Sequence, residues 1–331
     1  MRAVVVEKPG GPEVLRAVDV PAPSPDAGEL SIDVDFAGVG FVDTVFRAGG
    51  FGLALPFIPG IEVAGRVREL GAGVAGFRVG QPVAALLNDF GRGSRAGGYA
   101  EVAVARSGMV SAVPEGADLA CVAGVLVNGV TAWIALHHLA RLQVSDDVVV
   151  LGASGGLGGT ASRLAAIHPA RRVIGVAGSE RTRGFVPAQC TDVILGAQLS
   201  TALTKITDGR GADVVIDPVG GQLRAQAYQR LAPFGRLIVL GNASGQDQAL
   251  SSDAAWHGTR QLAGFSLGGI AHLVPAQIST AASAVVTLVH RGVLPEPAPV
   301  VLPLSRVSEI HRALENRCAP PKTVLAIHDD I

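Results

Sequence analysis

The chain has 331 residues, more than one hydrophobic core usually holds, so we expect two domains. A formal net charge of -1 and an aromatic content of 4% argue against nucleic-acid binding. Three cysteines far apart in the sequence provide neither a disulfide framework nor a metal-binding spacing. The N-terminus lacks the apolar core of a signal peptide, and no apolar run has the uninterrupted length of a membrane span. We therefore expect a soluble cytoplasmic protein with no membrane partner.

The first part of the chain, to about residue 120, is predicted to be rich in short β-strands. Glycine and proline turns separate the segments, and segment 29–36 alternates between polar and apolar residues, which is typical of a half-buried strand. The predicted strands are 2–7, 29–36, 62–70, 82–87 and 99–104. Many short strands with such turns favour a partly open barrel.

A glycine-dense turn, 152–159, follows the apolar run 148–151 and precedes a stretch with an apolar helical stripe. Consecutive apolar residues without alternation indicate a strand covered on both faces. Strand, glycine turn and helix form the opening unit of a dinucleotide-binding fold, in which backbone N–H groups and a helix N-terminus receive the diphosphate. The spacing, Gly152-x-x-Gly155-Gly156-x-Gly158, differs from the usual G-x-G-x-x-G, and an ordinary tight turn is the alternative.

Further strands at 172–177, 191–195, 212–217 and 236–240, mostly separated by helical segments, predict a doubly wound parallel sheet. A helical stretch at 122–142 precedes this sheet. The tail from about residue 270 is predicted to hold an apolar helix, a short helix near 305–315 and a last strand near 322–327.

In its ordered motifs the chain resembles the medium-chain dehydrogenase/reductase superfamily, and within it the zinc-free quinone oxidoreductase branch. The segments that carry the resemblance are 1–6, 10–15, 38–44, 56–65, 97–101, 131–133, 152–158, 217–221 and 235–241. The resemblance implies an α/β protein with a GroES-like β-barrel domain, 1–123, completed by 270–331. A Rossmann domain with a doubly wound parallel sheet, 124–269, is implied between these two parts.

The loop after the second strand of the sheet favours NADPH over NADH. An acidic residue there would bind the ribose 2′-OH of NAD. Here the chain reads Gly178-Ser179-Glu180-Arg181-Thr182-Arg183, whose serine and arginines can bind a phosphate. A solvated arginine pair at a helix start is the alternative. The resemblance adds Arg317 as a further cation, whereas Thr182 and Leu195 stand where relatives often have lysine and tyrosine.

The resemblance also implies the remaining coenzyme contacts and the substrate pocket. The residues expected to bind the coenzyme are Asn128, Thr131, Ser154, Gly155, Gly156, Leu157, Gly178, Ser179, Arg181, Arg183, Gly241, Asn242, Phe265, Ser266, Leu267 and Arg317. The residues expected to line the pocket are Gly40, Phe41, Asp43, Phe46, Phe51 and Asn242. Phe46 and Phe51 either stack on a flat acceptor or belong to the barrel core, and Asp43 is either a pocket carboxylate or, as we favour, a turn acid.

No side chain is assigned as a catalytic acid or base. Hydride transfer requires close placement of donor and acceptor, exclusion of water and stabilisation of the developing anion, and water can supply the proton. Tyr99 and Tyr228, the two tyrosines, are both expected to be structural. Relatives usually have asparagine at the position of Gly40 and often tyrosine near Phe46 or Phe51. Their absence predicts a less polar, roomier pocket that suits a bulky aromatic or polyketide-like quinone or enone.

No metal site is expected. Zinc-dependent relatives carry a cysteine near the position of Gly40 and a histidine near Ile61, and segment 88–93 lacks the cysteines of their structural zinc lobe. His137 and His138 are adjacent on a predicted helix and therefore face different directions.

Three functions remain open from the sequence. The first is an NADPH-dependent reductase of a hydrophobic small-molecule acceptor, a quinone or an enone. The second is an enoyl reductase acting on polyketide or thioester intermediates, although no lysine cluster suggests a basic entrance for a carrier. The third is an NADPH-binding protein with a structural or RNA-binding role and little turnover. The segment 261–267 resembles the sheet edge through which relatives form homodimers.

Overall fold

The computed structural model describes residues 1–87, 97–168 and 170–328. Its internal contacts divide the chain into two compact units, Met1–Val127 with Leu267–Ile331, and Asn128–Ser266. The domain boundaries expected from the sequence, after residues 123 and 269, lie a few residues from these divisions. Each unit is described by itself.

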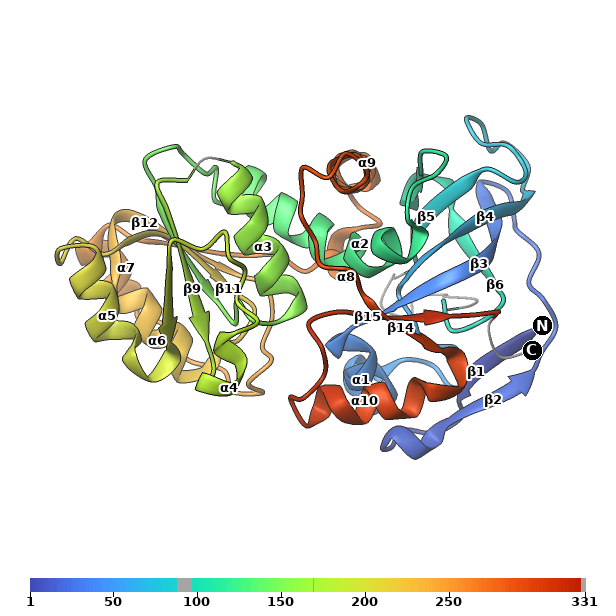
Figure 1. Cartoon of the computed structure of the whole chain (residues 1–331), viewed down its shortest axis with the longest axis horizontal. Coiled ribbons are helices and arrows are strands. Elements are labelled where there is room, and N and C mark those ends of the chain that lie inside the picture. The colour runs from blue at the N-terminus through green and yellow to red at the C-terminus, as the bar shows by residue number, and fades with distance from the viewer. Residues whose placement is uncertain (88–96, 169, 329–331) are drawn as a thin grey trace. The chain divides into compact units, whose positions relative to one another are not determined.

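The first unit is built on a mainly antiparallel sheet of seven strands, as the alternating segments and turns predicted (Figure 1). The neighbours run β14-β15-β3-β4-β5-β7, and β6 also pairs with β3. The bounds are β3 Glu29–Val39, β4 Glu62–Leu70, β5 Pro82–Leu86, β6 Val102–Arg106, β7 Val110–Ala112, β14 Val300–Pro303 and β15 Thr323–Ala326. Because β15 pairs with β3, the C-terminal segment completes the sheet that the N-terminal segment begins.

The strands β1 Arg2–Val6 and β2 Leu15–Asp19 form a separate antiparallel pair. The inward side chains of the unit form one core that includes Leu30, Ile32, Val63 and Leu325. The helices of this unit are α1 Phe41–Arg47, α8 Leu267–Ile270, α9 Pro275–His290 and α10 Val307–Glu315, and its short 3₁₀ turns are Pro12–Val14, Gly50–Gly52, Ser107–Met109 and Leu304–Arg306.

The second unit is a six-stranded sheet in which every neighbouring pair is parallel. The order is β10-β9-β8-β11-β12-β13, so the strand order reverses between β8 and β11. The strands are β8 Asp147–Leu151, β9 Arg172–Ala177, β10 Asp192–Leu195, β11 Ala212–Asp217, β12 Leu231–Val239 and β13 Gln261–Gly264. This is the strand order of a dinucleotide-binding fold, which places the ligand outside the carboxyl ends of the strands at the reversal.

Helices cover both faces of this sheet (Figure 1). On one face, α5 and α6 pack on a core that includes Val149, Ile174, Leu203 and Tyr228. On the other face, α3 packs on β8 and β9 and buries Ala161, Leu164 and Ala165. The helices are α3 Gly156–Ile167, α4 Glu180–Arg183, α5 Leu199–Ile206, α6 Gly221–Gln229 and α7 Ser252–Gly258, with a 3₁₀ turn at Gly196–Gln198. Coverage of both faces explains why β8 is apolar without alternation.

The helix α2, Leu119–Ile134, carries the chain from the first unit into the second and continues as a π-helical turn, Ala135–Leu139. Among the described residues this stretch alone has the length and apolar composition of a membrane span, and 72% of its most apolar window is buried in the protein. The expectation that no apolar run reaches such a length is therefore wrong. The burial explains the composition, because a core helix is apolar all round.

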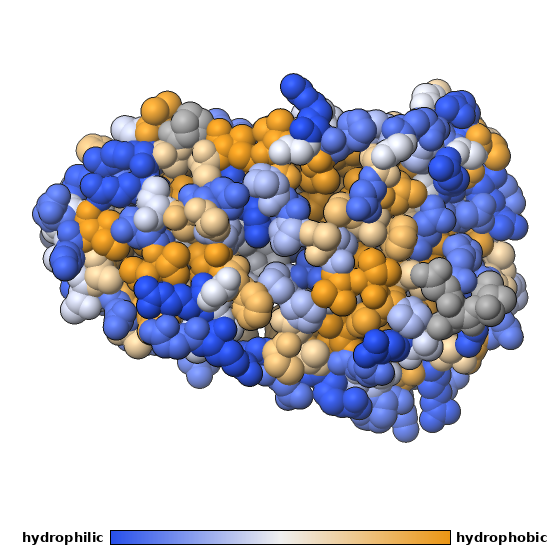
Figure 2. Space-filling view, viewed as in Figure 1, coloured by the Kyte–Doolittle hydropathy of each residue, from blue (hydrophilic) through white to orange (hydrophobic). Residues whose placement is uncertain are grey.

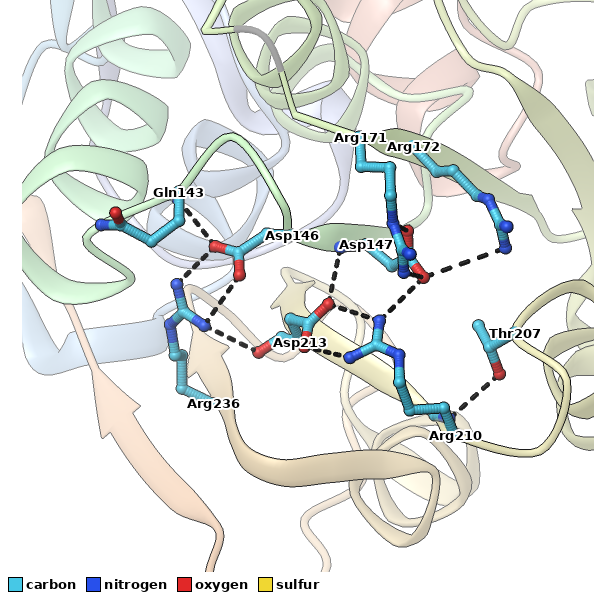
Figure 3. Close-up of polar contacts among 10 residues, drawn as sticks. Gln143, Asp146, Asp147, Arg171, Arg172, Thr207, Arg210, Asp213 and Arg236 are labelled. Carbon is cyan, nitrogen blue, oxygen red and sulfur yellow. Dashed lines mark hydrogen bonds and ion pairs between the residues drawn. The ribbon is translucent and has the colours of Figure 1, made fainter.

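A network of charged residues ties together the amino ends of the strands of the second unit (Figure 3). The fully buried carboxylate of Asp147 accepts hydrogen bonds from Arg171 Nε and Arg210 Nη2, each at 2.9 Å. Arg210 also donates to Asp213 at 2.7 Å, and Arg236 donates to Asp146 at 2.6 Å. Burial alone would raise the pKa of Asp213, but hydrogen bonds from Arg210 and from the Asp147 N–H hold it below its usual value.

The surface shown in Figure 2 mixes apolar patches with hydrophilic side chains. Several large apolar residues of the second unit are exposed, with Phe234 at 73%, Trp256 at 75% and Leu262 at 54%. Leu262 lies on β13, an edge strand of the sheet.

Candidate coenzyme and substrate sites

The glycine turn lies at the carboxyl end of β8, beside the reversal of strand order. Gly152 has φ +63°, a left-handed conformation that favours glycine. A Cβ on Gly158 would overlap the carbonyl oxygen of Gly152, so the first turn of α3 packs directly on the loop. These glycines are required by the tight turn and by the close approach of helix and strand, and both requirements belong to a diphosphate-binding loop.

The N-terminus of α3 has no capping side chain. Gly155 occupies the N-cap position in an extended conformation and makes no side-chain hydrogen bond to the helix. The N–H groups of Gly156 and Leu157 are among those that have no acceptor within a helix. Together with the helix dipole they form a site for an anionic group, and the half-buried Ser154 stands beside it. This backbone geometry can receive an anionic group such as a diphosphate.

The loop after β9 presents an exposed polar and cationic surface. Gly178, Ser179, Arg181 and Arg183 are all exposed, and a Cβ on Gly178 would meet no atom within 4 Å. Ser179 is tied to Thr182, whose Oγ1 accepts from the Ser179 N–H at 3.2 Å. The acid in the loop, Glu180, accepts a hydrogen bond from Arg183 at 3.5 Å.

The loop after β12 carries Gly241 and Asn242, and a buried ion pair that sequence reasoning missed supports it. Asp217, at the end of β11, accepts from the N–H groups of Val219 and Gly220 at 2.7 and 2.8 Å and pairs with Arg224. Arg224 Nη2 donates to the Gly241 carbonyl at 2.6 Å. The sequence did contain a signal for this pair, because Arg224 follows seven residues after Asp217, the acid at the end of β11. The pair holds the Gly241 loop at the same edge of the sheet as the glycine turn.

The other predicted coenzyme residues lie at three places. Asn128 is half-buried and Thr131 is buried on α2. Phe265, 8% exposed, and Ser266 follow β13, and Leu267 begins α8. Arg317 follows α10 and is exposed.

The predicted substrate segment forms α1 and the turn after it. Gly40 is the N-cap of α1, and Phe41 begins the helix with 43% of its surface exposed. Phe46 is 3% exposed, whereas Phe51 is 65% exposed, and their rings meet edge to face at 5.6 Å between centroids. Burial assigns Phe46 to the packing of its own unit, which leaves Phe41 and Phe51 as the accessible aromatic rings.

Asp43 is a buried turn acid. Its carboxylate accepts from the Gly40 N–H at 2.8 Å and from the Gly60 N–H at 3.2 Å, and it is fully buried. Burial raises the pKa of Asp43 to about 7, against the opposing effect of the Gly40 hydrogen bond. Asp43 therefore joins the loops before α1 and β4, as expected for a turn acid.

A chain of buried polar side chains extends from Asp43. Arg47 Nη1 lies 3.4 Å from His311 Nδ1, and His311 Nε2 lies 3.2 Å from the Tyr99 hydroxyl. Because arginine can only donate, Nδ1 is the acceptor and Nε2 carries the proton that His311 donates to Tyr99. Burial, followed by the charge and the hydrogen bond of Asp43, raises the pKa of Tyr99 well above its usual value. Tyr99 and Tyr228 are 0% and 3% exposed, so both are packed in cores.

A hollow of about 470 Å³ lies in the second unit at the opposite edge of the sheet. Some of its lining residues, such as Arg141, precede β8. Others lie on β12 or at the start of β13, including Phe234, Arg236 and Gln261. Coenzymes bind this fold at the carboxyl ends of the strands. The hollow is therefore separate from the candidate coenzyme site.

Across 1–87, 97–168 and 170–328, no three His, Cys, Asp or Glu side chains are grouped so that they could hold a metal ion. Segment 88–93, where zinc-dependent relatives have a structural zinc lobe, lies outside the described residues. His138 is exposed, whereas His137 stacks on Trp133 at 4.0 Å between ring centroids. His137 is half-buried.

A barrel-type unit joined to a doubly wound parallel sheet with a diphosphate-binding turn defines a class of dinucleotide-dependent oxidoreductases. The sequence families described as Alcohol dehydrogenase GroES-like domain and Zinc-binding dehydrogenase match residues 26–115 and 156–286. The chain is 34% identical over 247 residues, 73% of each chain, to quinone oxidoreductase of Rattus norvegicus. It is 28% identical over 341 aligned positions to a probable quinone oxidoreductase of Schizosaccharomyces pombe, covering 99% of this chain and 98% of that one.

A solved mycobacterial structure complexed with NADPH superposes with a TM-score of 0.88 at 29% identity, covering 99% of this chain and 100% of that one. The protein belongs to the medium-chain dehydrogenase/reductase superfamily, in its quinone oxidoreductase branch.

Proposed function

We propose that the protein is an NADPH-dependent oxidoreductase that transfers hydride to a quinone or an activated, enone-type double bond without a metal ion. The observation that carries the coenzyme assignment is the uncapped N-terminus of α3 behind the glycine turn, together with a cationic loop after β9. NADPH in the mycobacterial neighbour supports the same assignment.

In this proposal the coenzyme's diphosphate binds the N–H groups of Gly156 and Leu157, with Ser154 and Gly155 beside them; the Gly155 N–H itself donates to the Gly152 carbonyl at 3.0 Å. Its 2′-phosphate binds the loop of Gly178, Ser179, Arg181 and Arg183. Glu180 lies in the same loop and makes an exposed contact with Arg183 at 3.5 Å. The remaining assignments, Asn128, Thr131, Gly241, Asn242, Phe265, Ser266, Leu267 and Arg317, rest on the resemblance to the family.

The acceptor is proposed to contact the segment from Gly40 to Phe51. Bound NADPH supplies the hydride, and the chain needs to place the acceptor and exclude water. Phe41 and Phe51 offer exposed rings for a flat acceptor. Tyr99 is buried and hydrogen-bonded to His311, so water is the proposed source of the proton. Metal independence is supported by Gly40 and Ile61, which cannot ligate zinc through their side chains.

The test is a coenzyme and acceptor panel with the wild type and the double variant Arg181→Ala/Arg183→Ala. The wild type should oxidise NADPH in preference to NADH with quinones or enones, and a chelator should leave the rate unchanged. Loss of one charge-assisted contact is worth about 1.4 kcal/mol, so the double variant should lose at least about tenfold of its preference for NADPH over NADH. Equal use of both coenzymes by the wild type would reject the coenzyme assignment. Tight NADPH binding without oxidation across the panel would reject the reductase assignment.

We also propose a homodimer formed through the edge strand β13. Within the described residues β13 pairs with β12 alone, and Leu262 on this strand is 54% exposed. An edge strand with unpaired backbone groups favours such pairing. Light scattering should give twice the chain mass for the wild type and a smaller mass for Leu262→Lys. A monomeric wild type at micromolar concentration would reject this proposal.

A further inference from the structure

Glu62 is a buried acid for which the proposed function has no use. It begins β4 and is 2% exposed. One carboxylate oxygen, Oε1, lies 2.5 Å from Lys322 Nζ, and the other, Oε2, accepts a hydrogen bond from the backbone N–H of Val127 at 2.6 Å. Lys322 Nζ is also 3.4 Å from the Val39 carbonyl oxygen. One carboxylate oxygen therefore contacts the Lys322 ammonium group, and the other contacts the backbone of α2.

The hydrogen bond to Val127 is unusual because of its position in α2. Val127 lies in the middle of Leu119–Ile134, beyond the first turn whose N–H groups need outside acceptors. In a regular α-helix its N–H would donate to the carbonyl of Ala123. A side chain that enters this ladder fixes the local course of the helix. Glu62 therefore anchors α2 at one defined residue.

The backbone around this contact is shaped to admit the carboxylate. Gly38 on β3 is buried, and a Cβ there would overlap Glu62 Oε1 and lie 2.6 Å from the Ala123 carbonyl oxygen. On the other side, a Cβ on Gly124 would lie 3.3 Å from Lys322 Cγ. Glycines at both positions allow β3, α2 and the Lys322 side chain to approach one another closely.

Such a pair is costly to bury, so stability alone does not account for it. Removing a carboxylate and an ammonium from water is penalised by several kcal/mol per ion, and apolar residues of similar size often stabilise a core as well or better. An apolar pair could not accept the Val127 N–H, however. The pair therefore gives α2 a hydrogen-bond acceptor at Val127 that apolar side chains would not offer.

The residues that follow the anchor are those expected to meet the reactive end of the coenzyme. Asn128 is the next residue, and Thr131 lies one turn further along the same helix. We propose that Glu62 is a positioning residue: through Lys322 and the Val127 N–H it fixes the place of Asn128 and Thr131 for hydride transfer. This inference rests on the proposed function. A displacement of about 1 Å at a reacting centre can lower a rate about a hundredfold.

The test compares Glu62→Gln with Glu69→Gln in the full chain. Glu69 lies on the same strand but its side chain is 55% exposed, so it is a matched control. With NADPH and the best acceptor, Glu62→Gln should lower kcat about tenfold or more while the Kd for NADPH changes less than about threefold. The primary isotope effect with 4-deuterated NADPH should rise, because hydride transfer becomes slower relative to other steps. The control should match the wild type in all three measurements.

A readout that does not depend on turnover is amide hydrogen exchange. Exchange in peptides covering 123–131 should accelerate in Glu62→Gln and not in Glu69→Gln. If the wild type oxidises no NADPH, the proposed function is rejected. Hydrogen exchange would then still test whether Glu62 holds α2 in place. Unchanged exchange, or unchanged kcat and isotope effect in a folded Glu62→Gln protein, would overturn the positioning role.

Lys322→Gln provides a second route if Glu62→Gln does not fold. It removes the cation and leaves the bond to Val127, so we expect a smaller loss of kcat with the same unchanged NADPH affinity. If both single variants fold, the double variant should be no slower than Glu62→Gln, because residues that act as a unit have non-additive effects. Additive losses would show independent roles and would reject the pair as one anchor.

Discussion

The Tyr99 hydroxyl and His311 Nε2 lie 3.2 Å apart inside the first unit, although 212 residues separate them in the sequence. Tyr99 lies shortly before β6, which begins at Val102, whereas His311 lies on α10. Arg47 of α1 approaches the other ring nitrogen of His311 and also pairs with Glu315. This contact therefore joins the C-terminal helix to the segment that begins at Gly40. Protonation of His311 should therefore change the free energy of unfolding.

His311→Gln should make the protein less sensitive to acid. Burial, followed by the charge of Arg47, lowers the pKa of His311 from 6.5 to about 3. A depressed folded-state pKa means that the unfolded chain binds the proton first, so stability is fully present above pH 6.5 and is lost as the pH falls toward 3. Glutamine cannot take up that proton. Urea unfolding between pH 7 and 4.5 should therefore show a shallower loss for His311→Gln than for the wild type, and parallel curves would contradict this expectation.

Asp43→Asn should show the opposite pH dependence. Burial raises the pKa of Asp43 from 3.8 to about 7, so its contribution to stability is present below pH 3.8 and is lost as the pH rises toward 7. Asparagine stays neutral, although it has one acceptor oxygen for the two N–H groups of Gly40 and Gly60. The variant should be less stable than the wild type at pH 4.5, by about 1–3 kcal/mol for an unsatisfied buried group. That deficit should shrink in urea unfolding at pH 7.5, and a constant deficit would reject the raised pKa.

The sequence predicted the parts of this protein that local pattern determines. The apolar run before Gly152, the glycines after it and the alternation in 29–36 predicted the two sheets and the glycine turn between β8 and α3, and β4 was predicted with its observed bounds. Contacts between segments far apart in the sequence were not predictable in the same way. The pairing of Glu62 with Lys322, and of Arg47 with His311, depends on how strands and helices close in space. The same limit explains why Phe46 and Phe51 could not be separated before their burial was known.

Gly158→Ala should disrupt the coenzyme site, because the added methyl group would overlap the Gly152 carbonyl oxygen. The first turn of α3 would have to move from the loop, and the N–H groups at its N-terminus would move with it. We expect NADPH affinity to fall at least tenfold and stability to fall by about 1–3 kcal/mol, as is typical of overpacking. Gly184→Ala is the control, since a Cβ there meets no atom within 4 Å. Fluorescence titration with NADPH and urea unfolding measure the two effects, and equal affinities of the two variants would contradict the close packing of this turn.

Asp147→Asn should weaken the second unit without changing the coenzyme site. The buried carboxylate is held by Arg171 and Arg210 at the amino end of β8, the edge of the sheet opposite the glycine turn (Figure 3). The side chains of the two arginines are 45% and 41% exposed, so water can solvate them once the carboxylate is removed. We therefore expect a loss of stability of about 1–3 kcal/mol, less than the cost of leaving a buried charge without a partner. Glu309→Gln, which breaks the exposed pair with Arg306, should change the stability far less, because solvent screens this pair. Urea unfolding should separate the two variants while NADPH affinity stays equal to the wild type in both. If Asp147→Asn were no less stable than Glu309→Gln, the network would not be a stabilising feature of the sheet.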